Sequence, residues 1–256
     1  MKKLLAAVTV ALTLAITGVS AKVIATVNGY SITDKEANKL LKVMTKGKYK
    51  YSQLRPKDKQ EIVKRLAIDK IVISTAKRSL SKKEKRNLIA NAYLAKQAKG
   101  IKVSDKEARR VYNANKKFFK KKGKIQPFKK VKNTIKMQLK MRKVIDRLAK
   151  RNPKTFSKFR SNKDVFNFVA NYAQKHLSRD EKNFVIANYW MAKKIKNVKV
   201  SDAEALKAYK QNKKYFKDKK GRTIPYKKVK RIIKMQLKQK KVIDRLMKNA
   251  KIKIKS

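Results

Sequence analysis

The chain repeats part of itself, and this repeat limits the possible fold more than any other feature. Residues 79–119 recur as residues 176–216, and after a one-residue insertion residues 123–150 recur as residues 221–248. Between 129–150 and 227–248, 17 of 22 positions are identical. Chance does not produce such identity, so the second half is a duplication of part of the first. We call 79–150 the first copy and 176–248 the second copy.

Helix starts are legible because Ser or Thr stands three residues before Glu at five places. A hydroxyl and a carboxylate at this spacing bind the N–H groups that a helix start leaves without partners. Pro56, ahead of Asp58 and Glu61, indicates a sixth start. With six Gly and four Pro in the whole chain, helices should dominate. The five pairs are Thr33/Glu36, Ser81/Glu84, Ser104/Glu107, Ser178/Glu181 and Ser201/Glu204.

Each copy has the same order of expected elements. A helix beginning at Ser81 or Ser178 comes first, and the sequence Lys-Val-Ser-Asp then opens a short helix. Tyr-x-x-Asn-Lys-Lys-aromatic-Phe and a turn with Gly and Pro follow. An amphipathic helix closes each copy, because apolar residues recur at helical spacing. They are Val131, Ile135, Leu139, Val144, Ile145 and Leu148, matched by Val229, Ile233, Leu237, Val242, Ile243 and Leu246.

Two short segments are typical of strands. Residues 23–27 are mostly β-branched and run into the turn sequence Asn28-Gly29, and Ile252 and Ile254 alternate with lysines near the other end. Neither strand would be stable alone, so we expect them to pair with each other.

The predicted fold is therefore mainly α, with a partial tandem duplication and a small two-stranded β element that joins the two ends. We expect two mostly helical segments, 22–153 and 154–256. The break falls at Asn152-Pro153, where the closing helix of the first copy should end.

The first 21 residues are typical of an export signal. A positive start at Met1-Lys2-Lys3 precedes a 13-residue apolar run, and Val19-Ser20-Ala21 is a small-residue cleavage site. The run is shorter than the ~20 residues that span a bilayer as a helix, so cleavage after Ala21 is favoured over a permanent anchor. We expect an exported protein that acts outside the cytoplasm, with no membrane span after cleavage.

The net charge is extreme, at +59 from 75 Lys and Arg against 16 Asp and Glu. It would be +57 without Lys2 and Lys3. Such a field attracts polyanions and responds to salt. Two interpretations stay open: a basic protein that binds anionic lipid, surface polysaccharide or nucleic acid, and a solvated lysine surface on ordinary helices.

The residues that catalysis would use are scarce. Cysteine is absent and His176 is alone, which disfavours thiol chemistry and metal binding. Nine of the 16 acids lie within the five four-residue segments that the capping pairs bound, and we expect Asp69, Asp146 and Asp244 to form surface ion pairs. No Gly-rich phosphate loop or nucleophile elbow occurs. We therefore predict no catalytic residue, no cofactor and no metal.

Aromatic residues occupy the same places in both copies. Interleaved with Lys, they can grip apolar peptide segments or stack on bases, although their repetition favours core packing. Any that are exposed would form an adhesive surface. These candidate client-binding residues are Tyr93, Tyr112, Phe118 and Phe119 with their counterparts Trp190, Tyr209, Tyr215 and Phe216.

These motifs together resemble the chaperone domain of the SurA and parvulin-type foldase family. The resemblance begins with Val-Ile-Ala-Thr-Val-Asn-Gly at residues 23–29, followed by Ile32-Thr33, and covers nearly the whole first half. It reaches the second half through the duplication. Its other parts are residues 51–54, 66–70, Val103-Ser104-Asp105 leading to Tyr112 and Phe119, the closing helix at 127–148, and the last strand at 251–255.

The chain departs from that family where an isomerase domain commonly lies, between the Tyr-to-Phe motif and the closing helix. Only residues 120–126 and 217–224 fill this gap, and a domain needs about 50 residues or more. The resemblance therefore implies a chaperone module without prolyl isomerase activity. It would hold unfolded exported or outer-membrane polypeptides on apolar and aromatic helical surfaces without ATP.

Overall fold

The computed structural model describes residues 21–121, 123–218 and 220–255. The predicted export signal lies outside these residues except for Ala21. The protein is mainly helical, at 71% helix, with a small antiparallel sheet. Within the described residues, no helix has both the length and the apolar character needed to cross a membrane.

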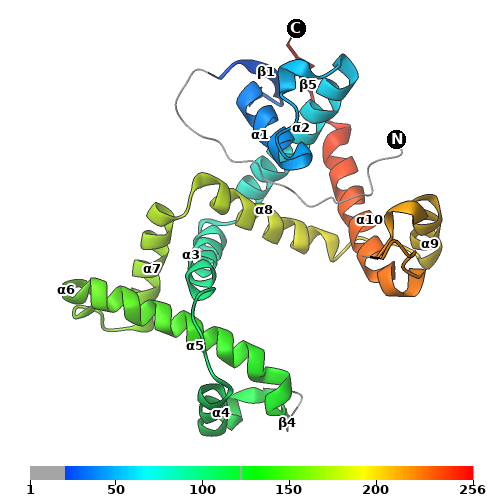
Figure 1. The fold of residues 1–256 in the computed structure, drawn as a ribbon. Helices are drawn as coiled ribbons and strands as arrows, with labels where there is room; N and C mark the ends of the chain where they lie inside the picture. Colours follow the sequence, from blue (N-terminus) through cyan, green and yellow to red (C-terminus); the bar gives the residue numbers. More distant parts are fainter. Residues whose placement is uncertain (1–20, 122, 219, 256) are drawn as a thin grey trace. The chain divides into compact units, whose positions relative to one another are not determined.

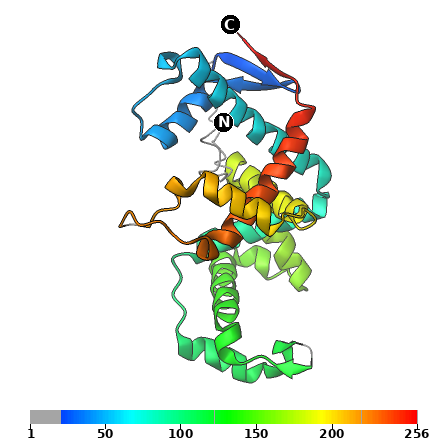
Figure 2. The ribbon, with the colours of Figure 1, turned by 90° about the vertical axis from the view of Figure 1, so that its right-hand side faces the viewer.

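Figures 1 and 2 show the elements in chain order. The first part of the chain contains β1 (Val23–Val27), β2 (Tyr30–Thr33), α1 (Asp34–Thr45), η1 (Tyr51–Gln53), α2 (Pro56–Ser79), α3 (Lys82–Ala98), α4 (Asp105–Ala114), η2 (Lys116–Phe119), β3 (Lys120–Lys121), β4 (Lys124–Ile125) and α5 (Phe128–Arg151). The rest contains α6 (Pro153–Phe156), α7 (Asn162–His176), α8 (Arg179–Ile195), α9 (Asp202–Gln211), η3 (Lys213–Tyr215), α10 (Tyr226–Lys248) and β5 (Ile252–Ile254).

All five predicted capping pairs are confirmed, because each hydroxyl accepts from a backbone N–H while the carboxylate three residues later accepts from the cap residue. Helix α2 begins at Pro56 as predicted, and α5 ends just before Asn152-Pro153. A sixth pair, Ser161 and Asp164, caps the start of α7 and was not predicted. Aspartate has the same acceptor group as glutamate, so the sequence did contain the indication.

The first and last strands pair antiparallel, as predicted, with Ala25 opposite Ile254 and Val27 opposite Ile252. Figure 1 shows β5 beside β1. Asn28 ties the ends further, since its backbone N–H donates to the Lys251 carbonyl at 3.0 Å and its side-chain oxygen accepts from the Lys251 N–H at 2.9 Å.

The predicted two-stranded element was wrong in its number of strands, because the sheet has the order β2-β1-β5. Asn28 and Gly29 have φ of 47° and 83°, so they form the tight two-residue turn that the Asn-Gly sequence favours. That turn brings Tyr30 opposite Val27 and folds β2 back onto β1. The alternation of Tyr30 and Ile32 after the turn was the missed indication of this strand.

The chain divides into two compact units by packing. One unit contains the described residues up to Lys85 together with those from Ser178 onward, and the other contains residues 86–177. Packing therefore interrupts the first copy, whose helix α3 begins in one unit and continues in the other. The segments 22–153 and 154–256 were defined by sequence duplication, and that division stays a prediction.

The core of the larger unit lies under the three-stranded sheet. Val27, Ile32, Leu40 and Ala67, from β1, β2, α1 and α2, are completely buried. The end of α10 packs against this cluster through Leu246, Met247 and Ala250. Both ends of the described chain thus complete one core.

The smaller unit contains an aromatic cluster between the two copies. Phe156 lies 4.8 Å from Phe159 and 5.0 Å from Phe168 between ring centroids, and Phe168 lies 5.7 Å from Tyr172. His176 stacks on Tyr172 at 3.7 Å. The lone histidine is therefore part of a packed aromatic row.

Candidate functional site

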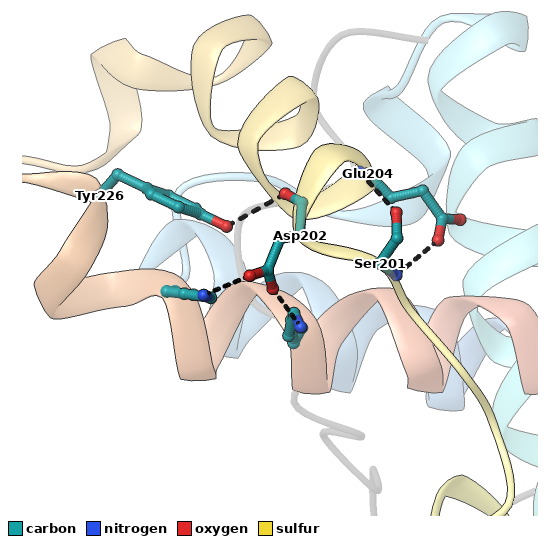
Figure 3. Close-up of polar contacts among 6 residues, drawn as sticks. Ser201, Asp202, Glu204 and Tyr226 are labelled. Carbon is teal, nitrogen blue, oxygen red and sulfur yellow. Dashed lines mark hydrogen bonds and ion pairs between the residues drawn. The ribbon is translucent and has the colours of Figure 1, made fainter.

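A polar clamp at the start of α9 fixes α10 against it (Figure 3). Ser201 accepts from the Glu204 N–H at 3.0 Å, which begins the helix at Asp202. The Asp202 carboxylate pairs with Lys230 at 2.6 Å and with Lys234. The Tyr226 hydroxyl donates to the Asp202 backbone carbonyl at 3.2 Å. Hydrogen bonds from the two lysines lower the pKa of Asp202 to about 2.

The Glu204 carboxylate, which caps the start of α9, makes a second connection to α10. It pairs with Lys241 at 2.6 Å. That hydrogen bond, followed by the one from the Ser201 backbone, lowers the pKa of Glu204. Each acid of the clamp therefore joins a helix start to a lysine of the closing helix.

The first copy contains an equivalent clamp. Asp105 pairs with Lys132 and Lys136, and Glu107 pairs with Lys143 at 2.7 Å. Lysine hydrogen bonds lower the pKa of both acids to about 2. The clamps use equivalent acids and lysines, and each joins a short helix to the long helix that closes its copy.

Beside the second clamp, α8 and α10 border an open groove of about 570 Å³. Ala192, Ile195 and Met235 give it an aliphatic lining, and Met235 is 46% exposed. The other lining residues are all cationic: Lys196, Lys227, Lys230, Arg231, Lys234 and Lys238.

The six cations of the groove fall into two classes. Asp202 neutralises part of the charge of Lys230 and Lys234. Among the described residues, no side-chain hydrogen bond or ion pair is found for the other four, Lys196, Lys227, Arg231 and Lys238. The groove therefore combines apolar area with unneutralised positive charge, which suits an anionic and partly apolar ligand.

The groove was not predicted, although the sequence contains an indication of its row of cations. Lys227, Arg231, Lys234 and Lys238 follow one another at steps of four, three and four residues. That spacing puts them on one face of a helix. This row does not stand out in the sequence, because lysine is frequent along the whole chain.

The predicted aromatic residues differ widely in exposure. Tyr93, Trp190 and Tyr209 are buried, at 6%, 3% and 8% exposed. Tyr112, Phe119 and Phe216 are half-buried. Tyr112 packs against Phe119 at 5.5 Å between ring centroids, and Phe216 packs against the buried Tyr209 at 5.4 Å. Core packing thus accounts for six of the eight candidates.

The other two candidates point outward at equivalent places. Phe118 in η2 is 83% exposed, and Tyr215 in η3 is 42% exposed with the Lys214 ammonium 5.2 Å from its ring centroid. The next residue in each copy, Phe119 or Phe216, is the one that packs inward. Of the repeated aromatics, each copy therefore presents one ring to solvent at the same place.

One carboxylate is not where the sequence analysis placed it. Asp244 pairs with Lys240 as expected, but Asp69 is 8% exposed within α2 and its Oδ2 atom has no hydrogen-bond partner. Burial raises the pKa of Asp69 to about 7, although the Arg65 charge acts in the opposite direction. The expected surface ion pair was wrong for this residue because its face of α2 packs inward.

Within the described residues, no three His, Cys, Asp or Glu side chains come together as a metal site. Comparisons with protein-family models, with curated proteins and with solved structures found no match for this chain. The candidate site must therefore be interpreted from its own geometry.

Proposed function

We propose that this protein is an ATP-independent periplasmic holdase for unfolded exported polypeptides, including outer-membrane proteins. The observation that carries the proposal is the aromatic ring that both copies expose at the same place, Phe118 and Tyr215. The other six repeated aromatics pack inside the chain.

A holdase must bind many sequences weakly, and exposed apolar area serves this better than a shaped pocket. Two rings on separate copies can contact two places along one unfolded chain. Linked weak contacts raise the overall affinity when both can be made at once. The high net charge would keep such complexes soluble.

The resemblance of the sequence to the SurA family supports the same function. The proposal includes the absence of isomerase activity, because residues 120–126 and 217–224 are too few to form an isomerase domain. A prolyl-peptide isomerisation assay is expected to show no rate above background. A rate that rises in proportion to the protein would overturn this part of the proposal.

The function is tested by aggregation of a urea-unfolded outer-membrane protein on dilution into 150 mM NaCl. The protein is expected to suppress light scattering at stoichiometric amounts, and F118S/Y215S should lose most of this protection. The matched control is Y30S/Y49S, which removes two exposed tyrosines outside the copies, at 43% and 55% exposure. No protection by the unaltered protein would contradict the proposal.

The second candidate function is binding to a nucleic acid, anionic lipid or polysaccharide. The unpaired cations of the groove are the observation that favours it. Binding of this kind weakens steeply with salt, because each neutralised phosphate releases counterions. Contacts through Phe118 and Tyr215 are apolar and should depend far less on salt.

A further inference from the structure

We propose that the groove between α8 and α10 binds an extended acidic segment of a client polypeptide, whose carboxylates meet the cationic row of α10 while its apolar side chains contact Ala192, Ile195 and Met235. This inference rests on the proposed function and assigns a preferred kind of client segment to one surface.

The spacing of the cations suits an extended chain. Lys227 and Arg231 are four residues apart on α10, which corresponds to ~6 Å along the helix axis. Every second residue of an extended peptide lies on one side, ~6.6 Å apart. Alternate carboxylates of a client can therefore reach successive cations of the row.

The charge of the groove is not neutralised from within. Lys227, Arg231 and Lys238 have no ion-pair partner among the described residues, and they lie in a concave surface with apolar walls. Like charges that gather in a cleft focus the field and raise the local concentration of anions. An entering carboxylate relieves this repulsion, and Arg231 can bind it with two parallel hydrogen bonds.

The clamp holds part of this surface in place. Lys230 and Lys234 line the groove and pair with Asp202. The α10 wall is therefore fixed against α9 before a ligand arrives. A wall that is already ordered loses less freedom on binding, which favours affinity.

The lining favours a polypeptide over a nucleic acid. The groove has no aromatic ring among its nine lining residues, whereas single-stranded nucleic acids are usually held by stacking of bases on aromatic side chains. Its volume of about 570 Å³ lies within the range of ligand sites in proteins.

The test uses fluorescence anisotropy of the full chain with a labelled 12-residue peptide in which Glu alternates with Leu and Ala, in 150 mM NaCl. The first copy provides the matched control. K227Q/K238Q removes two groove charges, and K129Q/K140Q removes two charges at the equivalent positions of the first copy.

The groove variant is expected to weaken peptide binding about fivefold to tenfold, as two partly exposed ion pairs would suggest. The control variant should stay within about twofold of the unaltered protein. A second variant, R231N, installs the residue that the first copy has at this position, Asn133, and should also weaken binding. Equal losses in the two double variants would show diffuse charge attraction and would overturn the proposal.

Three further probes complete the test. The same peptide with Gln in place of Glu should bind at least tenfold more weakly than the acidic peptide. A 12-nucleotide single-stranded DNA and vesicles with anionic lipid should each lose equal affinity in K227Q/K238Q and K129Q/K140Q. A loss confined to K227Q/K238Q with DNA or vesicles, and not with the peptide, would replace the acidic client with that ligand.

Failure of this inference can be told apart from failure of the proposed function. If K227Q/K238Q changes neither peptide binding nor protection of a client from aggregation, the groove assignment falls while the holdase function stands. If the groove binds the peptide but the protein protects no client, the holdase function falls and the groove remains a site for acidic segments.

Discussion

In the second copy Tyr209 is 8% exposed, whereas its counterpart Tyr112 in the first copy is half-buried. Both hydroxyls donate at 2.8 Å to a carbonyl of the turn before the closing helix, that of Ile224 or that of Gln126. The polar contact is the same, but its surroundings differ. Ala205, Ala208, Tyr209, Val229 and Ile233 form a buried cluster in the second copy, while α4 buries only Ala108.

Single substitutions explain part of this difference. Arg109 of the first copy lies over the Phe128 ring, with its guanidinium carbon 4.5 Å from the ring centroid. The equivalent residues of the second copy are Leu206 and Tyr226, and the Tyr226 hydroxyl donates to Asp202 instead. The polar clamps are thus retained in both copies, while the apolar surfaces around them have diverged.

The largest expected effect comes from the core of each copy. Ile233 and Ile135 are equivalent and both are completely buried. Changing a buried Ile to Ala costs about 2–5 kcal/mol of unfolding free energy, more where the surroundings are well packed. I233A should therefore lose more than I135A, measured by urea unfolding. Equal losses would show that the second copy is no better packed.

Asp69 lies outside the copies and extends the comparison to a buried acid. Its pKa is raised to about 7 from an ordinary 3.8, so the folded state holds this proton more tightly than the unfolded state. The contribution of Asp69 to the free energy of unfolding is complete below pH 3.8, where the carboxyl is neutral in both states. It is lost as the pH rises toward 7, because the unfolded state then releases the proton more readily. At ~1.4 kcal/mol per pKa unit, D69N should be more stable than the unaltered protein at pH 8 by roughly 4 kcal/mol.

At pH 4 the unaltered protein and D69N should unfold at nearly the same urea concentration, because the Asp69 carboxyl is neutral when folded. A constant difference between the two from pH 4 to pH 8 would show that Asp69 does not titrate in this range.

The tyrosine hydroxyls give a smaller and more direct test of the comparison. Y209F and Y112F each remove one hydrogen bond to a turn carbonyl, which is worth about 0.5–1.5 kcal/mol. The loss of unfolding free energy should be greater for Y209F. Its site is more buried, so water can replace the lost hydrogen bond to the Ile224 carbonyl less well. Unfolding by urea measures both, and a greater loss for Y112F would reverse the account.

The exposed clamps should show the smallest effects and no difference between the copies. The pKa values of Asp202 and Asp105 are lowered to about 2, so each contributes stability above pH 3.8 that is lost as the pH falls toward 2. D202N and D105N should remove this acid dependence to the same small extent, and 1 M NaCl should abolish it. Differential scanning calorimetry at pH 2 to 5 would detect a copy that depends on its clamp more than the other.

Local sequence rules predicted most of the fold. The capping pairs at Ser104 and Ser201 fix helix starts through contacts three residues apart, so no knowledge of the rest of the chain is needed. The pairing of residues 23–27 with the last strand followed from the fact that neither strand is stable alone. Strand β2 was missed, although Asn28-Gly29 is a strong hairpin indication.

The candidate site was less predictable, because exposure depends on packing between distant elements. Phe118 and Phe119 are adjacent and chemically identical, yet only Phe119 contacts Tyr112. In the same way, the lysine-rich neighbours of Asp69 predict a surface acid. Its burial instead depends on which face of α2 turns inward. No pattern along the chain separates these cases.

The most direct test of the central claim is the affinity of the protein for an unfolded outer-membrane protein, measured by fluorescence at 50 and 200 mM NaCl. A holdase that binds through exposed rings should retain its affinity to within about tenfold across this range. A loss of about a thousandfold or more, as for proteins that neutralise many phosphates, would contradict the holdase account and identify a polyanion binder.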